Sequence, residues 1–269
     1  MNTNEAHARV ICVANQKGGV GKSTTAEALA DGLVLKNHKT IIIDLDPQGN
    51  VSMAVGAVRG RPTAYEVMLK KCDAQEATQQ RTHDDTQEVK RADILPASPN
   101  LGKIDLELTS TGKEYRLKEQ LKPILSQYEY IIIDTPPALG VLTVNALTAA
   151  DVVLIPAQAD AYSMQGIGQL METIDAVREY TNPRLELMGV LFTRHNARTI
   201  LSRDMFEAAQ EITDKIGSFL YTTAIRETVV IKEAQASRQS VYSYAPTSNA
   251  AADYTAFVDE FLERSRVHA

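Results

Sequence analysis

The sequence is poor in cysteine and has no long apolar run. Cys12 and Cys72 are the only cysteines in 269 residues, too few for a disulfide framework or a cysteine metal cage, which fits a reducing cytoplasm. No apolar stretch follows a basic start, and no run of 18 apolar residues occurs. We therefore expect neither secretion nor a transmembrane helix, but a soluble cytoplasmic protein.

An excess of positive charge is also missing. The chain carries 28 lysines and arginines against 34 aspartates and glutamates, a net charge of −6, which argues against coating nucleic acid through overall charge. A local basic patch stays open, because residues 178–238 carry nine basic against eight acidic residues. No internal repeat and no helix-turn-helix before the first apolar run is evident, so sequence-specific DNA reading by an appended domain is not expected.

A glycine-rich segment directly follows the apolar run Val10–Ala14 and contains Gln16-Lys17-Gly18-Gly19-Val20-Gly21-Lys22-Ser23-Thr24. Glycines let a backbone curl until several N–H groups point at one anion, and the next helix adds its positive N-terminal end. The segment predicts a phosphate-binding loop, with nucleotide contacts from residues 17–24. In it, Lys22 reaches the terminal phosphates and Ser23 is a magnesium ligand.

The loop departs from the standard pattern G-x-x-x-x-G-K-[ST] in two ways. Gln16 stands where the first glycine is expected, and Lys17 is an additional lysine early in the loop. A long cationic side chain at that position could reach phosphate on another subunit. The alternative is a glycine-rich turn with two solvated lysines, but strand, loop and helix all occur in the order that a phosphate-binding loop requires.

Apolar runs rich in valine and isoleucine recur along the chain, at Val10–Ala14, Thr40–Ile43, Tyr130–Ile133, Val152–Ile155 and Leu187–Phe192. Helical spacing fills segments between them, at Lys22–Lys36, Lys113–Leu125, Gly166–Tyr180, Leu201–Ile216 and Ala250–Arg264. This alternation predicts an α/β fold, doubly wound around a mainly parallel sheet with helices on both faces. We expect one domain over residues 1–269, with a polar surface insertion near 70–91, an exposed helix or a mobile segment.

Acidic residues follow two of these runs, where strand ends form a ligand-binding edge. Asp44 and Asp46 follow the second, and in an extended chain they share one side. We expect Asp44 near the magnesium and Asp46 to orient the water that attacks the γ-phosphate, although a turn cap before proline is the alternative for Asp46. Asp134 ends the Tyr130–Ile133 run before two prolines. It has the form of a Walker B acid that holds a magnesium-bound water together with Ser23.

These motifs resemble those of the ParA/MinD family of ATPases. The glycine-rich loop is similar to the deviant Walker A loop of that family, and residues 44–50 match the Walker A′ motif of its ParA branch. The resemblance continues through 93–98, Ile155-Pro156, 191–193 and 244–254, nearly the whole chain. It fails at Ala224-Ile225-Arg226, where the family commonly shows Ile-Pro-Arg near the adenine.

The resemblance implies a slow ATPase that acts as a switch in plasmid or chromosome partition, with ATP and Mg²⁺ as cofactors. Lys17 becomes the signature lysine, which touches nucleotide in the facing subunit of an ATP-sandwich homodimer. Lys17, Lys22 and Asp46 form the catalytic set, and Ser23, Asp44 and Asp134 the magnesium set. A cytoplasmic protein that joins the nucleoid when ATP is bound is implied, with a centromere-binding partner of ParB type that stimulates hydrolysis.

The ParA resemblance further implies that the ATP-bound dimer binds DNA without sequence preference. Candidate phosphate contacts are basic residues of the C-terminal third: Arg194, Arg198, Arg203, Arg226, Lys232 and Arg238. Taken singly, each is more simply an ordinary solvated charge, because spacing alone does not place them on one face.

Two other classes on this scaffold fit less well. A MinD-like membrane switch needs a basic amphipathic C-terminal helix, whereas residues 253–263 are acidic on their polar side and only Arg264 and Arg266 follow. We expect this tail to pack on the body of the protein, with no membrane partner. The iron–sulfur reductases need paired cysteines at a dimer interface, and Cys12 lies in a predicted strand.

Overall fold

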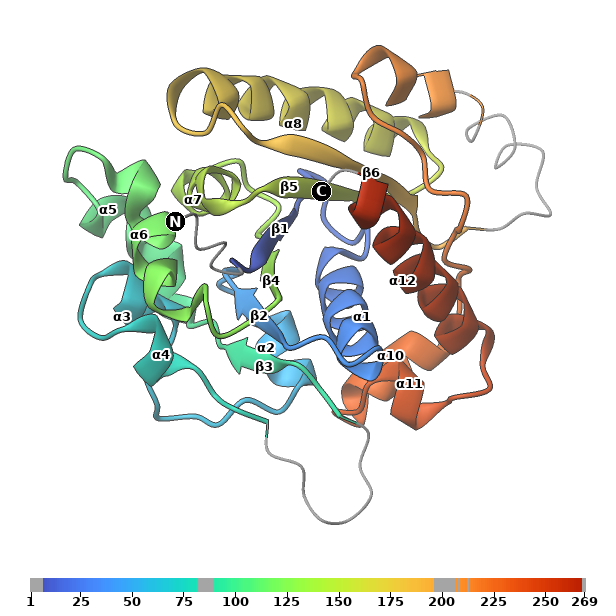
Figure 1. Cartoon of the computed structure of the whole chain (residues 1–269), viewed down its shortest axis with the longest axis horizontal. Coiled ribbons are helices and arrows are strands. Elements are labelled where there is room, and N and C mark those ends of the chain that lie inside the picture. The colour runs from blue at the N-terminus through green and yellow to red at the C-terminus, as the bar shows by residue number, and fades with distance from the viewer. Residues whose placement is uncertain (1–6, 82–89, 196–206, 208, 212, 268–269) are drawn as a thin grey trace, which may run out of the picture.

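Six strands form one sheet in which all neighbouring pairs are parallel, in the order β3-β2-β4-β1-β5-β6. The computed structural model describes residues 7–81, 90–195, 207, 209–211 and 213–267 (Figure 1). The strands are β1 (Arg9–Val13), β2 (Thr40–Asp44), β3 (Asp93–Leu95), β4 (Tyr130–Asp134), β5 (Val152–Ala157) and β6 (Glu186–Phe192). The predicted α/β fold is confirmed, and all five predicted apolar runs are strands.

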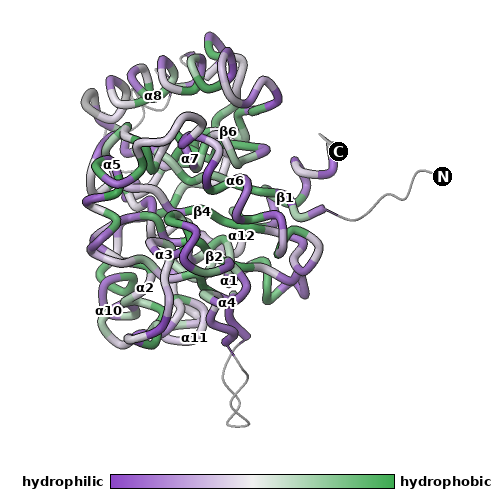
Figure 2. The backbone as a smooth tube through the Cα atoms, turned by 90° about the vertical axis from the view of Figure 1, so that its left-hand side faces the viewer, coloured by the Kyte–Doolittle hydropathy of each residue, from purple (hydrophilic) through white to green (hydrophobic). Residues whose placement is uncertain are grey.

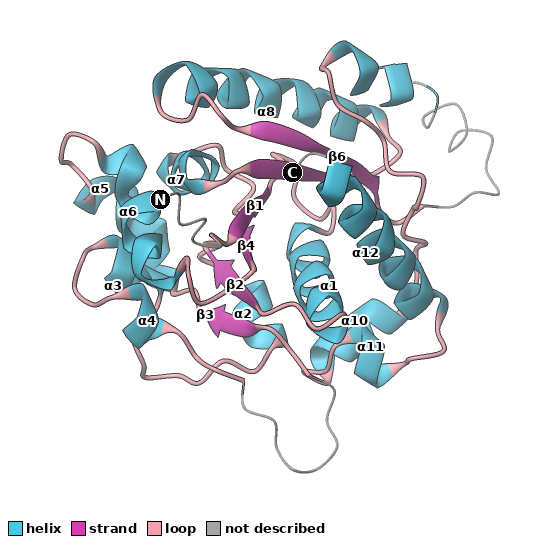
Figure 3. Ribbon diagram, viewed as in Figure 1, coloured by secondary structure: helices cyan, strands magenta, loops and turns pink. Residues whose placement is uncertain are grey.

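Helices connect the strands and cover both faces of the sheet (Figure 3). The α-helices are α1 (Lys22–Leu35), α2 (Asn50–Ala54), α3 (Ala64–Met68), α4 (Ala74–Ala77), α5 (Ile104–Glu107), α6 (Arg116–Leu121), α7 (Val141–Ala149), α8 (Ala161–Tyr180), α10 (Val230–Ala236), α11 (Val241–Tyr244) and α12 (Asn249–Val267). Short 3₁₀ turns are η1 (Pro99–Lys103), η2 (Lys113–Tyr115) and η3 (Lys122–Ile124). Four of the predicted helical segments are therefore helical. In the fifth, Leu201–Ile216, residues 207, 209–211 and 213–215 are helical, and the other residues except Ile216 lie outside the described part of the chain.

Two predicted helices differ in detail. The segment Lys113–Leu125 is divided into η2, α6 and η3. The end of α6 before η3 follows from Pro123, which cannot donate to the α-helical hydrogen-bond ladder. Helix α8 begins at Ala161, five residues before the predicted Gly166, where the Asp160 carboxylate accepts the Ser163 N–H at 2.9 Å and caps the helix.

Three side chains are buried in the segment near 70–91, for which we predicted a polar surface insertion. Ala74, Ala77 and Gln79 are buried. Gln79 pairs with Ile94 in an antiparallel bridge, and its side-chain amide bonds both the N–H and the C=O of Val58, at 2.7 and 3.0 Å. This segment therefore packs beside the edge strand β3, a three-residue strand too short for its apolar pattern to be recognised. Residues 82–89 lie outside the described part of the chain.

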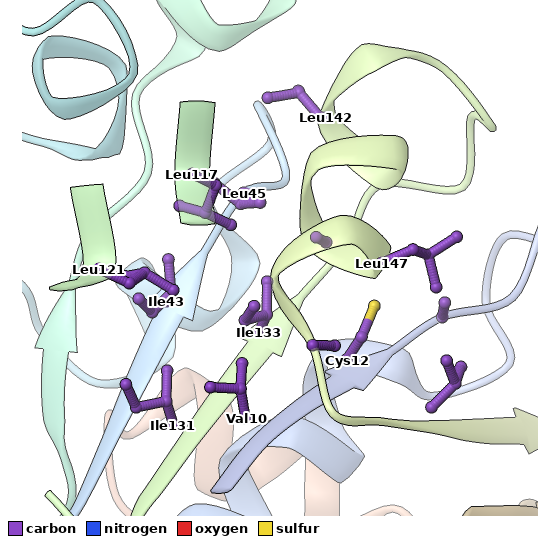
Figure 4. Packing of buried hydrophobic residues seen from close by; sticks show 14 of the residues in the cluster. Val10, Cys12, Ile43, Leu45, Leu117, Leu121, Ile131, Ile133, Leu142 and Leu147 are labelled. Carbon is purple, nitrogen blue, oxygen red and sulfur yellow. The ribbon is translucent and has the colours of Figure 1, made fainter. Parts of the chain in front are cut away.

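Alternation along the strands sends neighbouring side chains to two separate cores. One core joins Val10 and Cys12 of β1 to Ile43, Ile131 and Ile133 of the neighbouring strands and to helices α6 and α7, as Figure 4 shows. Cys12 is thus an inert core residue, and burial raises the pKa of its thiol. The hydrophobic colour of Figure 2 concentrates along the sheet in the middle of the molecule.

The second core joins Ile11 and Val13 to α1 and to the C-terminal helix α12. Phe257, Val258 and Phe261 of α12 are fully buried, and α12 runs beside α1 in Figure 1. The predicted packing of the tail on the body is confirmed. Among the described helices, none has the length and apolar character needed to cross a membrane.

Candidate functional site

Three central strands bring the predicted motifs to one edge of the sheet. β1 ends at Val13 just before the glycine-rich loop, and the pairing of β2 with β4 sets Asp44 directly beside Asp134. Val13 is in turn the register partner of Asp134. Because the carboxyl ends of parallel strands lie together, residues far apart in sequence meet here.

The loop backbone needs glycine at two positions. Gly19 has φ 76° and Gly21 has φ 83°, in the left-handed region that other residues rarely adopt. Gly21 is also the N-cap of α1, so the helix begins at Lys22, two residues before Thr24. The turn directs the N-terminal end of a 14-residue helix at whatever the loop encloses.

A cavity of about 540 Å³ opens over this loop. Most of the residues predicted to bind the cofactor line it, namely Gly18, Gly19, Gly21, Lys22, Ser23 and Thr24, together with Asp46. Val20, Lys17, Asp44 and Asp134 are not among its lining residues. Val20 is buried, and its carbonyl accepts a hydrogen bond from the Thr193 hydroxyl at 2.8 Å. Val20 therefore anchors the loop to the rest of the protein.

Lys22 lies in the floor of the cavity with only 6% of its surface exposed. Its ammonium group donates to the Lys17 carbonyl at 3.0 Å. Burial lowers the pKa of Lys22, while the charges of Asp134 and Asp46 act in the opposite direction. The Lys22 ammonium group thus lies where the phosphate oxygens of a bound nucleotide would replace water.

Asp134 is fully buried, and neither of its carboxylate oxygens accepts a hydrogen bond of ordinary geometry from a described residue. Burial raises its pKa well above the usual range and Asp44 raises it further, whereas nearby Ser23 and Lys22 favour the charged form. An orphaned buried carboxylate is costly unless something else satisfies it. A magnesium-bound water between Asp134 and Ser23 would do so.

The oxygen atoms at this edge of the sheet suit magnesium better than a metal ion that is coordinated only by protein side chains. Within the described ranges, no three His, Cys, Asp or Glu side chains gather as a metal cage. Magnesium prefers oxygen and keeps much of its water, commonly taking one or two protein ligands and the rest from phosphate and solvent. One hydroxyl and one carboxylate at this edge therefore fit that ion.

The two aspartates after β2 have different surroundings. The Asp44 carboxylate accepts the N–H and the hydroxyl of Ser52, at 2.8 and 2.6 Å, and the N–H of Asp46 at 3.1 Å. Burial raises the pKa of Asp44 to about 6, while these donors favour its charged form. Asp46 instead lines the cavity, with one oxygen occupied by the Gln48 N–H at 2.9 Å. Of the pair, only Asp46 lines the cavity.

Lys17 turns away from the cavity of its own chain. Its ammonium group lies 2.6 Å from Asp160 and 3.4 Å from the side-chain oxygens of Gln158 and Ser163. The side chains of Lys17 and Asp160 are 27% and 34% exposed. Sequence reasoning missed Asp160, although it follows β5, whose carboxyl end lies at the same sheet edge.

A second cavity of about 370 Å³ adjoins the first. The two share Gly19, Gly21, Thr24 and Gln235 as lining residues. The Gln235 amide donates to the Thr24 hydroxyl at 3.2 Å and joins α10 to the start of α1. Residues 225–229 form one wall of this second cavity, and they include Ile225 and Arg226 of the segment Ala224-Ile225-Arg226, where the resemblance fails. Gln235 carries no motif that would have identified it from sequence.

Comparison with known proteins agrees with this geometry. A family model described as an AAA domain matches residues 8–187. The chromosome partitioning protein ParA of Caulobacter vibrioides is 36% identical over 263 residues, which cover 96% of this chain and 95% of that protein. The chain belongs to the ParA family of ATPases. The sporulation initiation inhibitor protein Soj of Bacillus subtilis is 35% identical to this ParA-family chain, over 91% of its length and 95% of Soj.

A solved structure extends the comparison to three dimensions. A cobyrinic acid a,c-diamide synthase from Mycobacterium smegmatis, with bound ADP and magnesium, superposes on the ParA-family chain with a TM-score of 0.81. It is 32% identical, and the match covers 97% of each chain. The resemblance to ParA-type ATPases and their P-loop fold is thus confirmed.

Of the six basic residues predicted from the ParA resemblance to contact DNA, the four that the structure describes line two different cavities. Arg194 pairs with Glu227 at 2.7 Å, and Arg226 forms a two-pronged pair with Asp253. These two and Lys232 line the second cavity, whereas Arg238 lines a different groove. Arg198 and Arg203 lie outside the described residues. Tertiary contacts therefore already engage two of the four described candidates.

Proposed function

We propose that this ParA-family chain is an ATP-driven switch for DNA partition, which hydrolyses ATP slowly and acts as an ATP-sandwich dimer. One observation carries the proposal: the loop has two lysines, and only Lys22 lines the cavity of its own chain while Lys17 is held outside it on Asp160. A single-subunit nucleotide site needs one such cation. The second lysine, Lys17, would contact the nucleotide that is bound by a facing subunit.

ATP would span the two adjoining cavities, with its phosphates over the loop and its base against residues 225–229. The shared residues Thr24 and Gln235 would then flank the ribose. Ser23 and Asp134 would hold magnesium and its water, and the ion would neutralise charge between the β- and γ-phosphates. The bound ADP and magnesium of the M. smegmatis relative support this assignment.

Hydrolysis requires a water in line with the γ-phosphate and an acceptor that orients it. Asp46 fits that role because it lines the cavity that also contains Lys22. Asp44 would act indirectly. Its carboxylate accepts hydrogen bonds from Ser52 and from the Asp46 N–H, and these bonds fix the segment that carries Asp46. We therefore propose Asp44 as a positioning residue that reaches magnesium at most through water.

Dimerisation gives the first test. Lys17→Ala should weaken the ATP-dependent dimer but leave the nucleotide affinity of the single chain unchanged, because Lys17 lies outside the cavity of its own chain. A cation supplied across an interface stabilises charge on the terminal phosphate, as arginine fingers do. Sedimentation velocity with ATP measures the dimer. An unchanged dimer in the variant would refute the sandwich.

DNA and a partner complete the proposed cycle. The ATP-bound dimer would bind DNA without sequence preference on the nucleoid, and a centromere-binding protein of ParB type would stimulate hydrolysis. The full-length matches to chromosome partitioning proteins support this direction. The test is ATP turnover of the chain alone, with DNA, and with the protein encoded by the adjacent gene. Strong stimulation only when both are present supports partition, and no stimulation by any combination refutes it.

Two other roles are separated by the same preparations. The name of the M. smegmatis structure describes a synthase, and a synthase would couple ATP turnover to an added carboxylic acid. A membrane switch would sediment with liposomes when ATP is bound. The burial of Phe257 and Phe261 against the body of the protein argues against a C-terminal helix that inserts into a membrane. We expect turnover to respond to DNA and the partner protein, and not to a carboxylic acid.

A further inference from the structure

A groove of about 730 Å³ lies beside the nucleotide cavity, between α2, the loop 56–63 and residues 96–99. Its charged lining residues are three exposed arginines, Arg59, Arg61 and Arg238. No aspartate or glutamate is among the described residues that line it. In a chain of net charge −6, a groove lined by one sign of charge concentrates positive potential and attracts anions.

These arginines are free to bind a ligand. Within the described part of the chain, none of their guanidinium groups makes a hydrogen bond or an ion pair, whereas Arg194 and Arg226 are each engaged by a carboxylate. A paired guanidinium must give up its partner before it binds phosphate, and an unpaired one only exchanges water. Of the six DNA candidates read from sequence, Arg238 alone belongs to this set.

We propose that the groove of Arg59, Arg61 and Arg238 binds the phosphate backbone of DNA; this rests on the proposed function and names its DNA-contact surface. Phosphate contacts need cations and donors but no particular side-chain shape, which suits a partner bound without sequence preference. Gly60, between two of the arginines, has φ 80° and open space where a side chain would stand. A backbone can therefore approach closely here.

The groove is also connected to the nucleotide site, so its shape depends on what the site binds. Gln48 and Met53 line both. Ser52, which donates to Asp44 at the sheet edge, accepts the N–H of Ala97 in the groove wall at 2.8 Å. A shift of the segment after β2 on ATP binding would therefore change one wall directly.

The opposite wall is tied to the phosphate loop through α1. Arg91 pairs with Glu27 and Asp31 of α1, at 2.7 and 3.0 Å, and its guanidinium donates to the carbonyl of Arg238 at 3.1 Å. Both walls thus take their positions from elements that begin or end at the proposed nucleotide cavity. The spacing of the three arginines, and with it DNA affinity, would depend on the bound nucleotide.

The test compares Arg59→Ala/Arg61→Ala with a matched control, Lys118→Ala/Arg184→Ala. The control removes the same charge from exposed residues that line a cavity around the starts of β1 and β5. Affinity of each full-length protein for a labelled duplex of arbitrary sequence is measured with magnesium and a non-hydrolysable ATP analogue, between about 50 and 200 mM salt. Thermal unfolding and nucleotide affinity are measured in parallel, and Arg59→Gln/Arg61→Gln replaces the first variant if it is poorly folded.

We expect the groove variant to bind DNA roughly 10- to 100-fold more weakly. The slope of log affinity against log salt should fall by about 2 to 4, or about 0.9 for each phosphate that the variant no longer neutralises in one or both subunits. The control should keep the wild-type slope. An unchanged slope in the groove variant, or an equal loss of affinity in the control, would overturn the groove while leaving DNA binding intact. A wild-type protein that binds no duplex would overturn the proposed DNA function itself.

Discussion

The contact between Lys17 and Asp160 allows the proposed dimer to be tested by one substitution. In the isolated chain the Lys17 ammonium group lies 2.6 Å from the Asp160 carboxylate. If Lys17 must reach nucleotide in the facing subunit, that pair has to open first. Asp160→Asn removes the charge but keeps an oxygen that can cap α8 through the Ser163 N–H.

The magnitude follows from the exposure of the pair. With side chains 27% and 34% exposed, solvent screens the attraction, and such a pair contributes about 0.5–1 kcal/mol. A dimer opens two of them, so Asp160→Asn should favour the dimer by about 1–2 kcal/mol, roughly a 5- to 30-fold lower dissociation constant.

Sedimentation velocity over a concentration series, with magnesium and ATP, measures this shift. The control is Asp175→Asn, the same substitution on the same helix at a residue paired with Arg178 at 3.4 Å, and it should leave the dimer unchanged. The Lys17→Ala background gives a second control, because there Asp160→Asn has no pair to release. The reasoning fails if Asp160→Asn does not tighten the dimer, or tightens it equally without Lys17.

Three further substitutions test the site and its support. Lys22→Ala should weaken ATP binding about 10- to 100-fold, since a charge-assisted hydrogen bond to phosphate contributes roughly 1.5–3 kcal/mol; calorimetric titration that finds unchanged affinity would contradict the role of Lys22. Ser52→Ala deprives buried Asp44 of a hydroxyl donor at 2.6 Å and should lower the free energy of unfolding by about 1–3 kcal/mol in urea titrations, and equal midpoints would argue against it. Burial, and then the charge of Asp31, raises the pKa of Glu27 from 4.5 to about 7. A pKa that is higher in the folded state gives stability that is complete below pH 4.5 and lost as the pH rises through 7, up to about 3 kcal/mol. Glu27→Gln should flatten the pH dependence of unfolding in that window, and parallel curves for variant and wild type would exclude Glu27 as its source.

Much of the fold was predictable because its local signals agree with its global arrangement. Strands buried on both faces need nearly continuous apolar runs, and five such runs are visible in the sequence. The glycines of the phosphate loop are equally visible, since Gly19 and Gly21 occupy backbone conformations that other residues rarely adopt. The edge strand β3 escaped prediction because three residues are too few for a pattern.

The partners of charged residues were not predictable in this way. Asp160 is 143 positions from Lys17 and carries no motif, and Asp253 is 27 positions from Arg226. Whether a carboxylate meets a cation depends on which strands are neighbours and how their loops pack. The spacing of residues along the chain does not show these contacts. The predicted set of DNA contacts therefore included arginines that pair with a carboxylate, Arg194 and Arg226, together with Arg238, which has no such partner among the described residues.

By itself, the sequence determined the glycine-rich loop, five of the six strands and the positions of Asp46 and Asp134 after strands, because each depends on the local backbone or on strand ends. Tertiary structure alone decided that Lys17 is held on Asp160, outside the cavity that Lys22 lines. It also decided that Arg59, Arg61 and Arg238 share a groove without carboxylates among its described lining residues. The physical reason is that the energy of a charge is set by its neighbours in space, and folding alone chooses those neighbours.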